Sequence, residues 1–249
     1  MTRYGWIRLV IVAALALFLE ALCRTGVIPP LIMIPPSEML AAAWRILASG
    51  EMKGDFYSSL ANICIAIIFS VAGGFLAGLA IFSVPDLRAA AEPLLASYSA
   101  VPPIVFYPML IVIFGLNRVP QVLLAVMFGF VPMAIHTING LDRIRPVFLK
   151  VGRANRVSTF VSIFRIQLPA AAPYLFIGVT LAVSYSIIGV ISSEFVLSAK
   201  GIGHQISYAY DNYDNRVMYG LIVLVLGIAT LLNTSLRYYS QRMLKRWTR

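Results

Sequence analysis

Few side chains in this sequence could carry out acid–base or metal chemistry. Three ionisable residues, Glu20, His136 and Glu194, lie within or at the ends of long apolar segments, where such groups are costly and suggest a function. The sequence has 2 His and contains no His-Glu-x-x-His motif, no phosphate-binding loop and no nucleophile elbow. The cysteines Cys23 and Cys64 have no metal-binding spacing. We therefore expect this chain alone to hydrolyse nothing, to hold no metal and to need no cofactor.

The three ionisable residues have different interpretations. Glu20 precedes Arg24 by four residues, which favours a structural ion pair. His136 lies at the end of its apolar segment, so a helix-end role is favoured over a ligand role. Glu194 follows a polar run in a later segment. Its carboxylate either acts at a gate or belongs to a structural hydrogen-bonded network.

The elements that must position these residues are membrane helices. Hydrophobic residues make up 60% of the chain, charged residues make up 12%, and the mean hydropathy is +0.85. A helix needs about 20 residues to cross a hydrocarbon layer of roughly 30 Å. None of the apolar segments alternates like a barrel strand, so we predict an all-α integral membrane protein. Six segments are long enough to be transmembrane helices, namely residues 7–23, 62–83, 94–116, 119–138, 170–193 and 217–236.

Prolines and glycines mark two of these spans. Pro102, Pro103 and Pro108 interrupt the third span and free backbone carbonyls that must be satisfied inside the protein. Broken helices of this kind often line a cavity, and plain kinking for packing is the alternative. In the second span, Gly74 and Gly78 form a Gly-x-x-x-Gly pair that lets another helix approach closely.

The distribution of Lys and Arg predicts the orientation. Threading six helices with the amino terminus inside places fourteen of the 20 Lys and Arg on the inner side. Because cytoplasmic loops carry an excess of these residues, we expect both termini to be cytoplasmic. The first span is interpreted as a retained helix, since no signal-peptide cleavage site follows it. Topology and anionic lipid then explain the net charge of +10, so no nucleic-acid partner is expected.

The loop of residues 139–169 is the most informative element. It carries six Lys or Arg and one acid between two apolar spans, and it ends in Leu-Pro. We predict an amphipathic helix over about residues 151–165, whose arginines cannot enter the bilayer and whose Phe160 and Phe164 are too apolar for water. Such a helix should lie half-buried against a partner protein. The alternative is a basic helix that rests on anionic lipid.

Two outer segments carry aromatic side chains. Residues 27–59 begin with a Pro-rich stretch and continue as a helix that Ser37 can cap. We expect this helix to lie along the outer interface. The tyrosines of residues 199–220 form either an aromatic interface belt or a surface that docks an external protein. The apolar positions of the first segment are Leu40, Ala43, Trp44 and Leu47, and the tyrosines of the second are Tyr208, Tyr210, Tyr213 and Tyr219.

The end of the basic loop resembles the inner-membrane permease subunits of ATP-binding cassette (ABC) importers. Their signature reads E-A-A, three residues, G, nine residues, I, one residue, L-P. When Leu-Pro is placed on Leu168 and Pro169, the isoleucine falls on Ile166, which agrees. The start of the signature departs, because its glutamate, second alanine and glycine fall on Lys150, Gly152 and Arg156.

The resemblance extends over nearly the whole chain. The segment AEPLLASYSAVPPIVFYPMLIVIFGL is similar to the third helix of permeases for nitrate, sulfonates and taurine. The stretch PPSEMLAAAWRILASGE, Glu194 and the Gly-Ile-Gly of residues 201–203 fall where members of that subfamily have similar residues. The matching positions in the third helix are Pro102, Pro108, Phe114 and Gly115.

The resemblance implies a type I importer permease fold in the bacterial cytoplasmic membrane. The implied partners are a second permease copy, two cytoplasmic ATP-binding subunits that would bind ATP and Mg, and an extracytoplasmic substrate-binding protein. The basic loop would be the coupling helix, which fits a groove on the ATP-binding subunit. Such a subunit is not an enzyme and provides an alternating-access path. Its solute would be a small anion such as a sulfonate, taurine or nitrate.

Together with the residue patterns described above, the resemblance leads to predicted roles for particular residues. The predicted ATPase-coupling residues are Arg153, Arg156, Val157, Phe160, Phe164, Leu168 and Pro169. The predicted path or gate residues are Ser184, Tyr185, Ser193 and Glu194. The predicted binding-protein docking residues are Trp44, Tyr208 and Tyr210.

The chain is predicted to form a single permease domain over residues 1–249. The first helix and the outer segment occupy 1–61, the core helices occupy 62–236, and a basic cytoplasmic tail follows at 237–249. The alternative function is a secondary transporter driven by an ion gradient. That class is expected to carry ion-coupling carboxylates or broken helices in two matching halves, and the halves of this chain do not match.

Overall fold

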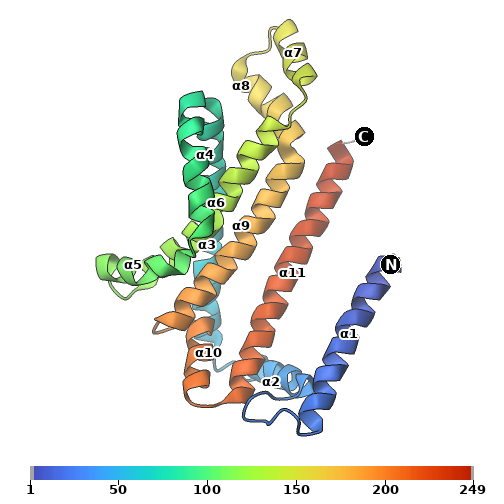
Figure 1. The fold of residues 1–249 in the computed structure, drawn as a ribbon, viewed down its shortest axis with the longest axis vertical. Coiled ribbons are helices and arrows are strands. Elements are labelled where there is room, and N and C mark those ends of the chain that lie inside the picture. Colours follow the sequence, from blue (N-terminus) through green and yellow to red (C-terminus); the bar gives the residue numbers. More distant parts are fainter. Residues whose placement is uncertain (1–2, 248–249) are drawn as a thin grey trace.

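The computed structural model describes residues 3–247, although the side chains of 3–5, 8, 9, 99, 153, 159 and 244–247 lie outside its described part. Within residues 3–247 every regular element is a helix, as predicted (Figure 1). A short 3-10 helix, Pro103–Phe106, precedes α5, and a π-helical turn, Ile163–Gln167, joins α8 to α9. The α-helices are α1 (Arg3–Arg24), α2 (Pro36–Ser49), α3 (Lys53–Ser83), α4 (Pro85–Ala100), α5 (Tyr107–Phe114), α6 (Arg118–Asp142), α7 (Pro146–Ala154), α8 (Thr159–Ser162), α9 (Leu168–Val196), α10 (Ile202–Asp211) and α11 (Asn215–Trp247).

The helices α3, α6 and α9 form the centre of the bundle, and glycines set how closely they pack. A Cβ atom at Gly74 would lie 2.5 Å from the carbonyl oxygen of Phe130, and one at Gly78 would lie 2.7 Å from that of Ala134. The predicted Gly-x-x-x-Gly contact is therefore confirmed, between α3 and α6. Gly129 of α6 similarly lies against the hydroxyl of Ser186 on α9. Small residues are typical of membrane helix interfaces because they let backbones approach.

Four helical segments of the described chain are long and apolar enough to cross a membrane: Lys53–Ser83, Arg118–Asp142, Phe160–Val196 and Asn215–Met243. A fifth is reached if Pro85–Tyr98 and Pro103–Phe114, which are bent by 91° to each other, count as one span. The predicted first span lies within α1. Six transmembrane helices and the side of the membrane on which the termini lie remain predictions.

The predicted interruption of the third span by its prolines is confirmed, but the helical bounds differ from residues 94–116. The helix begins at Pro85, breaks at the extended residue Val101, and resumes in a new direction after Pro102. The break follows from the chemistry of proline, which lacks an N–H and disfavours helical backbone in the preceding residue. Beyond it, α5 is anchored to α6 by the buried side chains of Tyr107 and Leu110.

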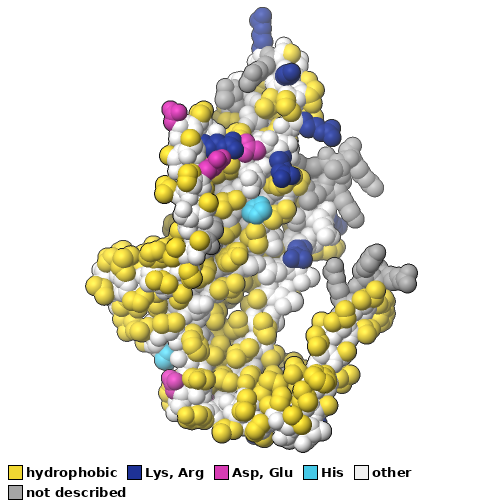
Figure 2. All heavy atoms as spheres, in the orientation of Figure 1, with side chains coloured by type: hydrophobic (Ala, Val, Ile, Leu, Met, Phe, Trp, Pro, Cys, Tyr) yellow, Lys and Arg dark blue, Asp and Glu magenta, His cyan; other side chains and the backbone are white. Residues whose placement is uncertain are grey.

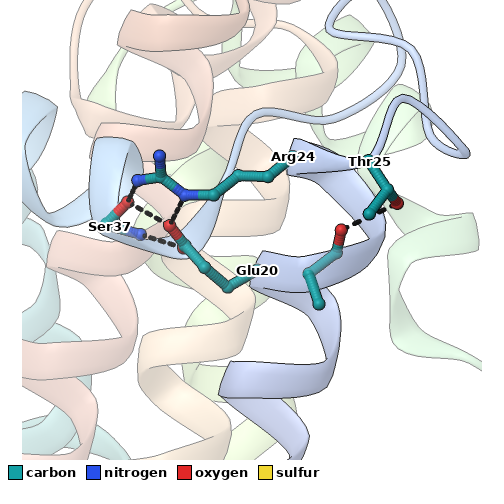
Figure 3. A network of polar contacts seen from close by, with 5 residues as sticks. Glu20, Arg24, Thr25 and Ser37 are labelled. Carbon is teal, nitrogen blue, oxygen red and sulfur yellow. Dashed lines mark hydrogen bonds and ion pairs between the residues drawn. The ribbon is translucent and has the colours of Figure 1, made fainter.

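The helices α1 and α2 are joined by a polar contact that the sequence interpretation assigned differently (Figure 3). We expected Ser37 to cap α2, but α2 has no side-chain cap and its first residue is Pro36. Instead the Glu20 carboxylate accepts hydrogen bonds from the Ser37 backbone N–H at 3.0 Å and from the Ser37 hydroxyl at 2.7 Å. The predicted ion pair of Glu20 with Arg24 is confirmed, at 2.6 Å. The Glu20 carboxylate of α1 thus provides a hydrogen-bond acceptor for a backbone N–H in the first turn of α2.

The outer helix α2 packs through a narrower face than predicted. Ala43 is buried together with Ala42 and Ile46, and all three lie against Gly220 of α11. The other three positions of the predicted apolar stripe, Leu40, Trp44 and Leu47, are exposed. Gly220 leaves room for α2 to approach α11 closely through Ala42, Ala43 and Ile46, while Leu40, Trp44 and Leu47 lie outside this contact.

The two ends of the molecule differ in charge. The helices α7 and α8 project from one end, toward which the amino end of α1 and the carboxyl end of α11 also point, and α2 and α10 lie at the other end (Figure 1). On the face shown in Figure 2, the visible Lys and Arg side chains gather toward the α7–α8 end. The segment predicted as a tail, residues 237–249, continues α11 as far as Trp247, and residues 248 and 249 lie outside the described part. The predicted boundary between residues 61 and 62 falls inside α3.

Candidate coupling surface and outer polar cluster

The basic loop contains two helical pieces joined by a turn, so the predicted continuous helix over residues 151–165 is wrong. The helix α7 ends at Ala154, and α8 begins only at Thr159. Between them Arg156 adopts a left-handed backbone with a φ of 50°, and the N–H of Val157 donates to the carbonyl of Gly152 at 3.0 Å. This six-residue closure around a left-handed residue is a Schellman C-cap, which usually uses glycine. Arg156 occupies the position at which the importer signature has its glycine.

The second half of the loop leads directly into α9. The Ser158 hydroxyl accepts the N–H of Val161 at 3.4 Å and caps α8. The π-helical turn then ends just before Pro169 in the first turn of α9. The wider turn fits the sequence, because a proline ring in a regular α-helix would clash with the carbonyl four residues earlier, that of Arg165. Leu168 and Pro169 are half-buried, so they form the base of the loop.

The two halves of the loop pack through a glycine and an isoleucine. A Cβ atom at Gly152 would lie 3.0 Å from the Cδ1 atom of Ile166, so α7 rests on the π-helical turn at this point. Ile166 is the residue that agrees with the importer signature. The contact explains why a small residue, Gly152, occupies a position at which the signature has alanine.

Large apolar side chains on the loop have no cover within the described chain. Phe160 is 71% exposed and Phe164 is 55% exposed, and their ring centroids lie 4.7 Å apart. On α7 the side chains of Val147, Phe148 and Val151 are also exposed. We call these five residues the loop surface. Apolar groups gathered on a protruding, otherwise basic segment indicate a binding surface for another protein.

The predicted coupling residues are only partly brought together. Phe160 and Phe164 share one surface, Arg156 is exposed at the turn, and Val157 is half-buried beneath it. The side chain of Arg153 lies outside the described residues. Sequence reasoning missed the apolar residues of α7, although the signal was present as Val-Phe directly after Pro146.

A polar cluster surrounds Glu194 at the opposite end of the bundle. The Glu194 side chain is completely buried, and its carboxylate accepts hydrogen bonds from the Ser59 hydroxyl at 2.6 Å and the Gly203 N–H at 3.1 Å. Gly201 has a φ of 113°, and a Cβ atom there would collide with the carboxylate. The Gly-Ile-Gly sequence therefore folds around Glu194, which favours the structural interpretation of this residue.

Other residues of α3 and α10, together with Gln121 of α6, supply the rest of the cluster. Asp55 of α3 accepts the Gly201 N–H at 2.7 Å and the side-chain amide of Gln205 on α10 at 2.9 Å. Asn62 donates to Gln121 of α6 at 3.0 Å. Sequence reasoning missed Asp55, Asn62 and Gln121, and only the position of the last two within apolar spans hinted at them. Their partners are distant in the sequence and cannot be read from local spacing.

The predicted path or gate residues do not form one surface. Ser184 lies 2.9 Å from the Asn233 side-chain oxygen and links α9 to α11. Tyr185 is exposed, whereas Ser193 is fully buried and donates to the carbonyl of its own helix at Val190. Their role in a path remains a prediction.

The predicted docking residues are all exposed at the α2–α10 end. Trp44 lies on α2, and Tyr208 and Tyr210 lie on α10. Tyr219 differs, because its hydroxyl donates to the Ile32 carbonyl at 2.7 Å and so holds the outer segment.

His136 is half-buried, and its Nδ1 atom has no hydrogen-bond partner among the described residues. Among the described residues, no group of three or more His, Cys, Asp or Glu side chains is placed to hold a metal ion.

Known proteins match almost the whole length of this chain. The family model for the binding-protein-dependent transport system inner membrane component matches residues 70–249. A Bacillus subtilis (strain 168) protein named as an aliphatic sulfonates transport permease, SsuC, is 24% identical over 98% of this chain and 88% of its own length. The taurine transport system permease protein TauC of Escherichia coli (strain K12) is 25% identical over 87% of this chain and 80% of its own length.

The helical fold of this chain is similar to that of a solved transporter structure. The MetNI methionine ABC transporter in an inward-facing conformation matches with a TM-score of 0.66 and 19% identity, over 80% of this chain and 96% of the matched chain. At this identity the match shows the arrangement of helices.

Proposed function

Because the chain belongs to the family of binding-protein-dependent transport system inner membrane components, we propose that it is the membrane path of an ATP-driven importer. It is an ABC importer permease of the bacterial cytoplasmic membrane. In the proposed assembly, two copies of this chain combine with two cytoplasmic ATP-binding subunits and one external binding protein. The chain would span the membrane six times with both termini in the cytoplasm. ATP and Mg would bind to the partner subunits alone.

The observation that carries this proposal is the loop surface. Phe160 and Phe164 together expose a little more than one whole phenylalanine side chain. Burying a phenylalanine contributes about 1.5–3 kcal/mol, so covering both would contribute roughly 2–4 kcal/mol to a complex. An apolar surface on a loop that also carries six Lys or Arg fits a cytoplasmic partner better than it fits water or hydrocarbon.

The proposed solute is a small anion. TauC is named for taurine and SsuC for aliphatic sulfonates, and a relative from Synechococcus elongatus (strain ATCC 33912 / PCC 7942 / FACHB-805), CmpB, is named for bicarbonate and is 29% identical over 79% of this chain and 72% of its own length. All three names refer to compounds with an anionic group. We therefore place this chain with permeases for small sulfonates or similar oxyanions.

The experiment is ATP-dependent uptake in proteoliposomes that contain this chain, its ATP-binding subunit and its external binding protein. Phe160→Asp or Phe164→Asp should abolish coupling of uptake to ATP hydrolysis while the bundle stays folded, because the charge would be buried in the contact. A matched control is Tyr57→Asp, which changes an aromatic side chain of 75% exposure near the start of α3, away from the loop surface. Phe160→Leu should retain most of the coupling.

Two results would contradict the proposal. Uptake by the chain without any ATP-binding subunit, driven by an ion gradient, would favour a secondary transporter. Unchanged coupling in both aspartate variants would show that the loop surface is not the contact with the ATP-binding subunit.

A further inference from the structure

The basic loop stands on a small apolar cluster. Leu141 at the end of α6, Ile144 just after it and Ala171 of α9 are buried there, and Leu149 of α7 packs against them. Phe82, in the last turn of α3, packs against the same cluster. The cluster at the base of the loop therefore joins α3 to α6 and α9, although only α6 and α9 adjoin the loop along the chain.

Arg88 of α4 links the same helix ends through its guanidinium group. The group donates to both carboxylate oxygens of Asp142, the last residue of α6, at 2.7 and 2.6 Å. Its Cζ atom also lies over the Phe82 ring, 5.9 Å from the ring centroid, and its Nε atom donates to Glu92 of the same helix at 2.7 Å. Two parallel hydrogen bonds between an arginine and a carboxylate fix direction as well as distance.

The ion pair holds a helix that has little buried surface. No described side chain of α4 is buried, and α4 lies at the edge of the bundle (Figure 1). The extended residues Val84 and Val101 connect α4 to its neighbours, and such short connections fix where a helix begins and ends but allow it to tilt. Near Val101 the Tyr98 hydroxyl donates to the Met127 carbonyl at 2.9 Å. At the other end, the contact of Arg88 with α6 sets the tilt of α4. The half-buried side chains of α4 form one stripe, namely Arg88, Ala91, Leu95 and Tyr98.

We propose that Arg88 is a positioning residue for the coupling of ATP hydrolysis to transport, because it carries a displacement of the basic loop into α3 and α4. This inference rests on the proposed function. Asp142 lies four residues before the start of α7 at Pro146, so it moves whenever the loop moves. The chain itself passes this displacement to α9, and Arg88 passes it to the helices that precede α6 in the sequence. Without the ion pair, the ATP-binding subunits could move the loop while α4 stayed behind.

The first test is Arg88→Gln, which removes the ion pair. In proteoliposomes with the ATP-binding subunit and the binding protein, uptake is measured with taurine, ethanesulfonate and bicarbonate as probes. The Arg88 and Asp142 side chains are 33% and 34% exposed, so solvent screens their attraction only in part. Uptake per ATP hydrolysed should therefore fall roughly three- to tenfold. The rate of ATP hydrolysis should change little, because the loop surface stays intact. The matched control Glu92→Gln removes the ion pair within α4, leaves the contact with Asp142, and should keep native coupling.

Exchanging the two residues tests the geometry. Arg88→Asp and Asp142→Arg should each lower uptake per ATP, and the two changes together should restore most of it. Failure of the double variant to restore coupling, or native coupling in Arg88→Gln, would overturn the inference. Equal losses of ATP hydrolysis and uptake in Arg88→Gln, with a lower melting temperature of the complex, would show that Arg88 only stabilises the fold and would also overturn it. Absence of ATP-dependent uptake of all three probes by the native complex would contradict the proposed function, on which the inference rests.

Discussion

Replacing Arg156 by glycine should stabilise the turn of the loop. Arg156 is held at a φ of 50°, and a left-handed backbone costs an L-residue about 1–2 kcal/mol. Glycine adopts this backbone freely but loses about 0.5–1 kcal/mol more chain entropy on folding. The expected net gain is therefore about 0.5–1 kcal/mol.

Hydrogen exchange at Val157 measures this gain directly. The Val157 N–H donates to the Gly152 carbonyl at 3.0 Å and closes the turn, so it exchanges only when the turn opens. In Arg156→Gly its exchange should slow by roughly two- to fivefold. The matched control is Arg165→Gly, which removes the same charge from the helical backbone of the π-helical turn. There glycine costs about 1 kcal/mol, so exchange nearby should become faster.

The decisive result is that amide exchange becomes slower in Arg156→Gly and faster in Arg165→Gly. If exchange at Val157 were unchanged or faster in Arg156→Gly, the left-handed backbone would not be the source of strain. If both variants slowed exchange, loss of positive charge would explain the effect, and the argument from backbone conformation would be refuted.

Four other substitutions test the helix packing and the contact between α1 and α2. Gly201→Ala should lower the thermal melting temperature of the detergent-solubilised protein, because it combines a φ of 113° with a collision against the buried carboxylate, at a cost of about 1–3 kcal/mol. Gly78→Ala should destabilise by about 1–3 kcal/mol, since its Cβ atom would lie 2.7 Å from a carbonyl of α6. Gly227→Ala, with no atom within 4 Å of its Cβ position, should not destabilise in the same melting assay. Ser37→Ala removes a donor to Glu20 and should speed limited proteolysis between α1 and α2; an unchanged cleavage rate would contradict this role.

The sequence could predict the helical membrane architecture because that information is local and additive. A run of about 20 apolar residues is sufficient to indicate a span. The observed ends differ where short-range chemistry decides them, as at Val101, where two prolines follow and the helix breaks. The prolines were visible in the sequence, but the 91° bend that they produce depends on how α5 packs on α6.

The loop shows where local reasoning fails. Arginine is a good helix former, so residues 151–165 read as one amphipathic helix. The turn at Arg156 exists because α7 folds back until Gly152 meets Ile166. A tertiary contact therefore overrides helix propensity. The clue was the glycine that the importer signature has at this position, because glycine is the residue that most readily adopts a left-handed backbone.

The outer polar cluster was only partly visible for a related reason. Glu194 stood out as an acid near the end of a span, but its partner Ser59 is 135 residues away in the sequence. Likewise Asn62 and Gln121 meet only because α3 packs on α6. A single polar residue in an apolar span can be noticed, whereas the network that satisfies it requires the fold.

The glycine contacts of the bundle determine how a force on the loop would spread. The helices before and after the loop, α6 and α9, touch through Gly140 and Gly178, where Cβ atoms would each lie 2.9 Å from the Cβ of a residue on the other helix. Close packing on both sides leaves little room for one helix to slide past the other. A displaced loop should therefore carry α6 and α9 together. Arg88 ties α4 to the same end through two hydrogen bonds to Asp142, at 2.7 and 2.6 Å, so relative motion should concentrate at the break near Val101.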